Sequence, residues 1–165
     1  METIRRTAEF DATPEAVFAV ISDPKFQQAK AEGTVGIPGA SATVTPAGDG
    51  VRIETVRLLP TASMPDFVKS FVGEQLRVTE VQTWGPARAD GGRAATVEAV
   101  VQGAPVTLRG DLVLDPSGTG SSETFEGQLS AEVFLLGGKV EKAASPFLAQ
   151  AVEAEFELIR QHLQP

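Results

Sequence analysis

The longest segment of the chain with the pattern of a helix is residues 137–163, GGKVEKAASPFLAQAVEAEFELIRQHL. At about 100° per residue, one broad arc of this segment is apolar, while the opposite side carries glutamate, glutamine and arginine. The apolar arc consists of Phe147, Leu148, Ala151, Val152, Phe156, Leu158, Ile159 and Leu163. The pattern predicts an amphipathic helix that packs on a surface. Because the segment follows strand-like segments with too few other helices to cover them, we expect it to form the missing layer over a sheet.

Pro146 is expected to interrupt this helix, because proline lacks an N–H group and its ring clashes with the previous helical turn. The pair Ser145-Pro146 has the chemistry of an N-cap followed by a first helical residue. The sequence therefore predicts a short turn at residues 138–144, followed by a kink or a new start of the helix.

Length and composition indicate a single globular domain over residues 1–165, since 42% of the residues are hydrophobic. The chain has no cysteine, which excludes disulfides, thiolate catalysis and cysteine metal sites. It has no tyrosine and one histidine, His162. The residue types for a serine triad or a multi-histidine metal site are therefore scarce. We therefore expect neither a metal nor a cofactor.

The net charge of −8, from 14 basic and 22 acidic residues, argues against a nucleic-acid partner and against an anionic membrane surface. No apolar run is long enough to span a bilayer, and no charged and then apolar leader follows Met1. We expect a cytoplasmic protein without stable membrane insertion.

The N-terminal part of the chain predicts one strand and two short helices. Residues 3–10 alternate between apolar and polar side chains. Thr13 and Pro14 suit the N-cap and first position of a helix that ends at Asp23-Pro24. The same pair can cap a second helix, over residues 25–32, that stops at Gly33.

The rest of the chain, up to the closing helix, predicts mostly strands. A weak strand at 42–45, a turn at 46–50 and a strand at 51–59 precede an insertion with helical spacing at 65–73. Four further strands are expected at residues 75–84, 93–102, 105–115 and 122–136. The short turns between them imply antiparallel neighbours. The fold class is therefore α+β, with a curved antiparallel sheet of about six to seven strands against a long C-terminal helix.

Two glycines, Gly110 and Gly127, fall on the inward side of their strands. Glycine inside a strand often marks a bend or a place that is kept empty. We favour the interpretation that they let the sheet curl around the helix.

The sequence resembles the START-like, helix-grip superfamily, also called SRPBCC, which contains polyketide cyclases and the birch-pollen-allergen type. The resemblance rests on Thr13-Pro14-Glu15-Ala16-Val17-Phe18 leading to Ser22-Asp23-Pro24, and on the closing Leu136-Gly137-Gly138-Lys139-Val140-Glu141. It is more closely similar to a bacterial branch catalogued as a domain of unknown function, through residues 65–72, Thr83-Trp84-Gly85 and Gly103-Ala104-Pro105-Val106. The resemblance implies a deep cavity between curved sheet and long helix that usually holds an apolar or amphipathic small molecule. The superfamily contains both binders and enzymes.

Three polar residues are expected to face the sheet–helix interior. Glu155 and His162 fall near the middle of the apolar arc, and Glu80 shares a strand face with Val78. Glu155 could hold the polar end of a ligand or act as an acid or base, and Glu80 could pair with it across a cavity. The alternative that we favour is a solvated or structural role for Glu155 and an ordinary ion pair or rim charge for Glu80, with Arg57 as a possible countercharge. His162 lies near the chain end, where we expect no special role.

The insertion at residues 64–72 could cover the mouth of the cavity as a lid, with Phe67 and Phe71 as its apolar residues and Gly73 as its hinge. The alternative, which we favour, is a fixed plug at one end of the sheet. Trp84 is expected to be a packing residue rather than a stacking platform.

These observations predict a START-like domain that binds a hydrophobic or amphipathic, lipid-like small molecule without changing it. Two alternatives remain: a cyclase- or hydrolase-type enzyme that uses the inward carboxylates, and a protein-interaction module with a filled core. The residues predicted to contact the ligand are Phe18, Phe67, Phe71, Val78, Glu80, Val97, Leu112, Leu129, Leu148, Val152, Glu155 and Phe156.

Overall fold

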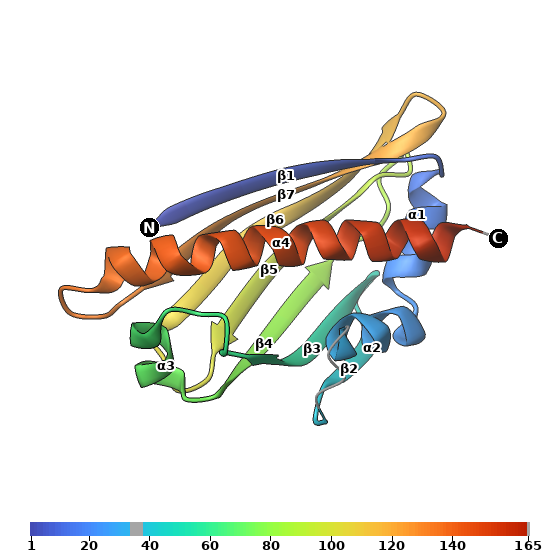
Figure 1. Cartoon of the computed structure of the whole chain (residues 1–165). Helices are drawn as coiled ribbons and strands as arrows, with labels where there is room; N and C mark the ends of the chain where they lie inside the picture. Colours follow the sequence, from blue (N-terminus) through green and yellow to red (C-terminus); the bar gives the residue numbers. More distant parts are fainter. Residues whose placement is uncertain (34–37, 165) are drawn as a thin grey trace.

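The computed structural model describes residues 1–33 and 38–164, apart from the side chain of Phe71, and in these residues an antiparallel sheet faces one long helix. In chain order the elements are β1 (Glu2–Phe10), α1 (Pro14–Ile21), α2 (Pro24–Glu32), β2 (Ser41–Ala47), β3 (Gly50–Pro60), α3 (Asp66–Val72), β4 (Gln75–Trp84), β5 (Arg93–Val101), β6 (Val106–Ser117), β7 (Gly120–Ala131) and α4 (Gly137–Leu163). The seven described strands follow the order β1-β7-β6-β5-β4-β3-β2. Helix α4 crosses the inner face of the sheet (Figure 1). The predicted α+β architecture, with two short helices after the first strand, is confirmed.

Side-chain caps fix the first residues of the two helices that follow β1, as the sequence predicted. Thr13 Oγ1 accepts a hydrogen bond from the Ala16 backbone N–H at 3.2 Å, and Asp23 Oδ1 accepts one from Lys25 N–H at 2.9 Å. Both caps precede a proline at the first helical position. These caps turn the chain sharply enough for α1 and α2 to lie near the C-terminal half of α4 (Figure 1).

The densely packed core occupies the part of the molecule next to α1 and α2. The rings of Phe10 and Phe156 meet edge to face at 6.4 Å, and those of Phe18 and Trp84 at 5.4 Å. Phe26 of α2 is fully buried in the same region. At the other end of α4, the small helix α3 lies across the end of the sheet (Figure 1). The large side chains therefore fill one end of the space between sheet and helix, and the opposite end is left for a cavity.

The predicted turn at 138–144 and the new start at Pro146 are wrong, because α4 runs through the proline as one helix from Gly137 to Leu163. The alternative of a kink at Pro146 stays a prediction. Proline in a helix interior removes one hydrogen bond and costs about 3 kcal/mol. Apolar residues on both sides of the proline, including Val140 and Leu148, face the same interior space. A continuous packed face outweighs the loss of the single hydrogen bond.

The last strand is shorter than the predicted 122–136, since β7 ends at Ala131. Beyond this point β7 has no strand to pair with, because β1 begins opposite Leu129 and β6 begins opposite Ala131. The following residues leave the sheet, with Leu135 at φ 62° and Phe134 largely exposed. Apolar sequence alone did not reveal that partner strands were missing.

The predicted strand at 42–45 is longer in the structure, where β2 continues through Pro46 to Ala47. Pro46 was assigned to a turn, but it pairs with Val51 on an edge strand, where its missing N–H is tolerated. The turn is therefore shorter than the predicted 46–50.

Gly110 and Gly127 lie opposite each other on β6 and β7. A Cβ atom at Gly127 would lie 2.6 Å from Cζ of Phe125, so this place is filled by a ring rather than kept empty. At Gly110 a Cβ would meet the backbone of β7, including the Cα of Gly127 at 2.7 Å. The two strands approach more closely here than any larger residue allows.

We expect Gly110→Ala to lower the free energy of unfolding by about 1–3 kcal/mol, because the added methyl group would push against backbone rather than against a flexible side chain. Gly138→Ala is the matched control, since a Cβ there meets nothing within 4 Å and a substitution without a clash is expected to change stability by no more than about 0.5 kcal/mol. Urea unfolding of the two variants measures the difference. Equal stability of the two variants would contradict the close approach of β6 and β7.

Candidate functional site

A cavity of about 170 Å³ lies between the sheet, α3 and the first half of α4. Almost all of its wall is apolar. The side chains that face it come from β3 to β7 and from both helices, and include Val68, Leu76, Val78, Leu108, Leu129, Val133, Val140, Phe147 and Leu148. The helix α3 borders the cavity through Val68 and Val72, so the insertion covers one side of it. Whether α3 acts as a fixed plug or as a movable lid stays a prediction.

A smaller space of about 30 Å³ adjoins this cavity beneath the middle of α4. Arg57, Glu80, Leu108, Leu148 and Ala151 border both spaces. The walls of the small space are more polar, because Gln82, Glu123 and Glu155 contribute to it. The site thus consists of a large apolar chamber with a small polar extension.

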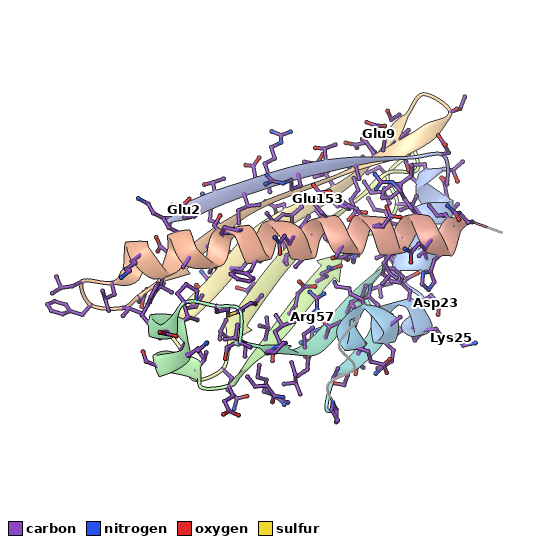
Figure 2. The ribbon with its side chains drawn as sticks, viewed as in Figure 1. Glu2, Glu9, Asp23, Lys25, Arg57 and Glu153 are labelled. Atoms are coloured by element: carbon purple, nitrogen blue, oxygen red, sulfur yellow. The ribbon has the colours of Figure 1, made fainter. Side chains whose placement is uncertain are left out.

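A buried ammonium group holds two of the carboxylates that line this polar extension. Lys30 of α2 is 2% exposed, and its Nζ lies 2.8 Å from Oε1 of Glu80 and 3.1 Å from Oε1 of Glu155. The three residues come from α2, β4 and α4, so the cluster ties the helices to the sheet. Arg57 of β3 is a second positive charge at the border of both spaces; Figure 2 labels it beneath α4.

The charges in this cluster stabilise one another. Burial alone would lower the pKa of Lys30, but the negative charges of Glu155 and Glu80 outweigh burial and hold that pKa above its ordinary value. Burial would raise the pKa of Glu80, but Lys30 and then Arg57 hold it below its ordinary value. Both groups are therefore ionised at neutral pH.

Glu80 is also held by a chain of hydrogen bonds along the inner face of β4. Trp84 Nε1 donates to Gln82 Oε1 at 2.9 Å, and Gln82 Nε2 donates to Glu80 Oε1 at 3.0 Å. Each member of the chain lies two residues from the next, as strand alternation requires. The packed core thereby fixes the position of a carboxylate at the cavity.

Glu123 of β7 is the third carboxyl group that lines the polar space, after Glu80 and Glu155. It is 1% exposed, and its Oε2 atom has no hydrogen-bond partner within the described part of the chain. Burial, with the negative charge of Glu155 adding to it and that of Lys30 opposing it, raises the pKa of Glu123 to about 8. Glu123 is therefore mostly protonated and uncharged at neutral pH.

Most of the predicted ligand-contacting residues line these two spaces. They are Val78 and Leu129 at the large cavity, Glu80 and Leu148 at both, and Val97, Leu112, Val152, Glu155 and Phe156 at the small one. Contact with a ligand stays a prediction for all of them.

Two predicted residues lie elsewhere. Phe18 is packed between Trp84 and the guanidinium of Arg93, 3.9 Å from its ring centroid. Phe67 lies under Nζ of Lys139, 4.6 Å from its ring centroid, and does not line the cavity. The side chain of Phe71 lies outside the described residues.

The inward position that the helical arc gave to His162 is wrong, because this side chain is exposed. Its ring stands edge-on to Phe26 at 5.2 Å, and its Nδ1 lies 3.0 Å from the carbonyl oxygen of Leu158. Ile159 and Leu163 of the same arc still pack on the core, so His162 stands at the margin of the arc, beside α2.

Sequence reasoning missed Lys30 and Glu123. Lys30 follows the buried Phe26 by four residues and thus shares its helix face, and Glu123 precedes the inward Phe125 by two on the same strand. Both spacings were readable, but a charged residue on an apolar face is more often solvated than buried. The favoured interpretation of Glu80 as one half of an ion pair agrees with the structure, but its direct partner is Lys30 rather than Arg57.

Two kinds of feature are absent from the described residues, 1–33 and 38–164. No group of three or more histidine, aspartate or glutamate side chains there is placed to hold a metal ion. None of the helices among them is long and apolar enough to cross a membrane.

Comparisons with known proteins place this site in a familiar fold. Over 156 residues the chain is 24% identical to the uncharacterized protein Rv0481c of Mycobacterium tuberculosis, with 90% of this chain and 89% of that protein covered. It superposes with a TM-score of 0.62 on the Zhui aromatase/cyclase from Streptomyces sp. R1128, at 12% identity over 98% of this chain and 93% of that one. It also superposes with a TM-score of 0.57 on a fragment of the STAR-related lipid transfer protein from Xanthomonas axonopodis, at 18% identity over 99% and 86%.

These structural likenesses confirm the helix-grip fold that the sequence resemblance implied. The family described as protein of unknown function (DUF2505) matches residues 5–163, which is nearly the whole chain. The protein therefore belongs to the DUF2505 family.

Proposed function

We propose that the protein binds a hydrophobic or amphipathic small molecule, without changing it, in the space between the sheet and α4. The observation that carries this proposal is the 170 Å³ cavity with its nearly continuous apolar wall. An apolar cavity of this size that served only packing would cost stability in proportion to its volume. A pocket with an apolar body and few polar anchors is the usual form of a small-molecule site.

The cavity volume limits what fits without rearrangement. An apolar cavity of about 150 Å³ accepts benzene, so a space of 170 Å³ accommodates a group about the size of one ring or a short branched chain. The cavity is partly open to solvent, so a larger ligand, such as a molecule with two fused rings, can place one ring inside and extend past α3 with the rest. Arg57 and Glu80, at the inner end of the cavity, are placed to meet the polar end of an amphipathic molecule.

The alternative of an acid–base enzyme that uses Glu80 and Glu155 is less well supported. Both carboxylates contact the same Nζ of Lys30, at 2.8 and 3.1 Å. The ammonium group engages both carboxylates and holds the pKa of Glu80 below its ordinary value, whereas acid–base catalysis needs one protonated and one ionised partner. The alternative of an interaction module with a filled core is also less well supported, since the core leaves a cavity unfilled. The lipid transfer protein and the aromatase/cyclase of similar fold are compatible with binding but do not decide between classes.

We expect Ala151→Phe to weaken binding of prodan, an uncharged fluorescent naphthalene probe, by about tenfold or more, equivalent to about 1.4 kcal/mol. Ala151 borders both spaces, so the added ring would occupy the volume that the probe needs. Ala154→Phe is the matched control, because Ala154 is an exposed residue of the same helix. A fluorescence titration measures the affinities, and thermal unfolding verifies that both variants fold. The proposal fails if wild-type protein shows no saturable binding, or if the two variants bind the probe equally well.

A further inference from the structure

The buried side chain of Glu123 has a carboxyl oxygen without a hydrogen-bond partner among the described residues, which is rare in a protein interior. Glu123 is 1% exposed, and this oxygen is its Oε2. A buried polar atom without a partner costs roughly 1–3 kcal/mol. The same side chain lines the 30 Å³ space that adjoins the apolar cavity. The Glu123 side chain therefore borders a space that lies next to the apolar cavity.

We propose that this small space is the head-group subsite of the ligand cavity and that it takes a single uncharged hydroxyl group, such as that of an alcohol or phenol. The inference rests on the proposed function and specifies the ligand class for it. The apolar body of the ligand lies against Leu148 and Ala151, which border both spaces, and its hydroxyl group lies beside Glu123.

The size of the space selects a compact head group. About 10–15 Å³ of such space is enough for one water molecule, and the space next to Glu123 has about 30 Å³. A hydroxyl group therefore fits, and little room remains for a bulkier head group.

The charges around the space favour an uncharged head group. Glu80 of β4 and Glu155 of α4 face it as carboxylates, and Lys30 of α2 is engaged by both of them. Arg57 of β3 is the other cation at its border. With Glu123 protonated, as its pKa of about 8 implies at neutral pH, these charges already balance. A neutral hydroxyl group preserves that balance, and it can both accept a hydrogen bond from the Glu123 carboxyl group and donate one to a carboxylate.

Three probes of the same two-ring body test the subsite in the wild-type protein: 2-naphthol, 2-methylnaphthalene and 2-naphthoate, titrated by calorimetry at pH 7. We expect 2-naphthol to bind about tenfold more tightly than 2-methylnaphthalene, as one buried hydrogen bond predicts, and 2-naphthoate to bind most weakly. A purely apolar cavity would give the opposite order for the first two, because the methyl group is the more hydrophobic substituent. Equal or tighter binding of 2-methylnaphthalene would show that the space holds only water and would overturn the subsite, while leaving the proposed function intact.

Two variants assign the effect to Glu123. Glu123→Gln keeps a donor and an acceptor, so we expect it to retain the preference for 2-naphthol over 2-methylnaphthalene. Glu123→Met has a similar length without either group, and we expect the affinity ratio to fall from about ten to about one. An unchanged ratio in Glu123→Met would overturn the role of Glu123. If no probe binds wild-type protein at all, the proposed function itself fails, and that result is distinct from a lost preference.

Discussion

Replacing Lys30 with methionine is expected to lower the free energy of unfolding by about 3–5 kcal/mol, as is typical when one partner of a buried ion pair is removed. Lys30 is 2% exposed and contacts Glu80 and Glu155. Without the ammonium group, two carboxylates would face each other in a poorly solvated space. Urea unfolding at neutral pH measures the loss.

Two comparisons separate the ion cluster from a general effect of the substitution. Lys25→Met changes an exposed lysine of the same helix and is expected to alter stability by no more than about 0.5 kcal/mol. The triple variant Lys30→Met, Glu80→Gln, Glu155→Gln removes the charges together and is expected to recover most of the lost stability, since unpaired charge is the main cost. If Lys30→Met is as stable as Lys25→Met, the buried cluster does not stabilise the protein.

Replacing Glu123 with glutamine is expected to stabilise the protein at high pH but not at low pH. The pKa of Glu123 is about 8 in the folded protein against an ordinary value of 4.5, so the folded state retains a proton that the unfolded state loses between these values. Wild-type stability should therefore fall as pH rises from about 4.5 to about 8, by as much as about 4–5 kcal/mol in total. Glutamine is uncharged over this whole pH range, so the variant should not show this loss of stability.

The measurement is the free energy of unfolding of both proteins at pH 5 and at pH 9. We expect a small difference at pH 5 and a gain of several kcal/mol for Glu123→Gln at pH 9. The neighbouring charged groups, Glu155, Lys30, Glu80 and Arg57, are the same in both proteins and largely cancel in the comparison. A difference that does not change with pH would contradict a buried, protonated Glu123.

The architecture was predictable because strand alternation and helix caps are local features. Ile4, Ala8 and Phe10 are inward as their alternation indicated, and Thr13 caps α1 through its side chain. The sequence did not predict where pairing ends, because the end of β7 depends on where β1 and β6 begin. Nor did it predict that α4 continues through Pro146, because the benefit comes from packing against a sheet that is distant in sequence.

The polar part of the site was predictable only in part, for a similar reason. Glu80 and Glu155 were expected to face the interior, and both do. Lys30 binds both of them from a helix that is 50 residues from Glu80 along the chain, and no local pattern connects the three. The volume and position of the cavity likewise depend on side chains from β3 to β7 and both α3 and α4. Such a volume is a property of the assembled fold.

Methyl NMR with selectively labelled valine and leucine provides the most direct test of ligand binding between the sheet and α4. In a titration with 2-methylnaphthalene, we expect the methyl resonances of Val78, Leu129 and Leu148, which line the cavity, to shift with a single saturation curve. The methyl groups of Val100, which is 49% exposed and outside the cavity lining, should not shift. Shifts confined to exposed residues, or no saturable shift at the three lining residues, would contradict a ligand site in this cavity.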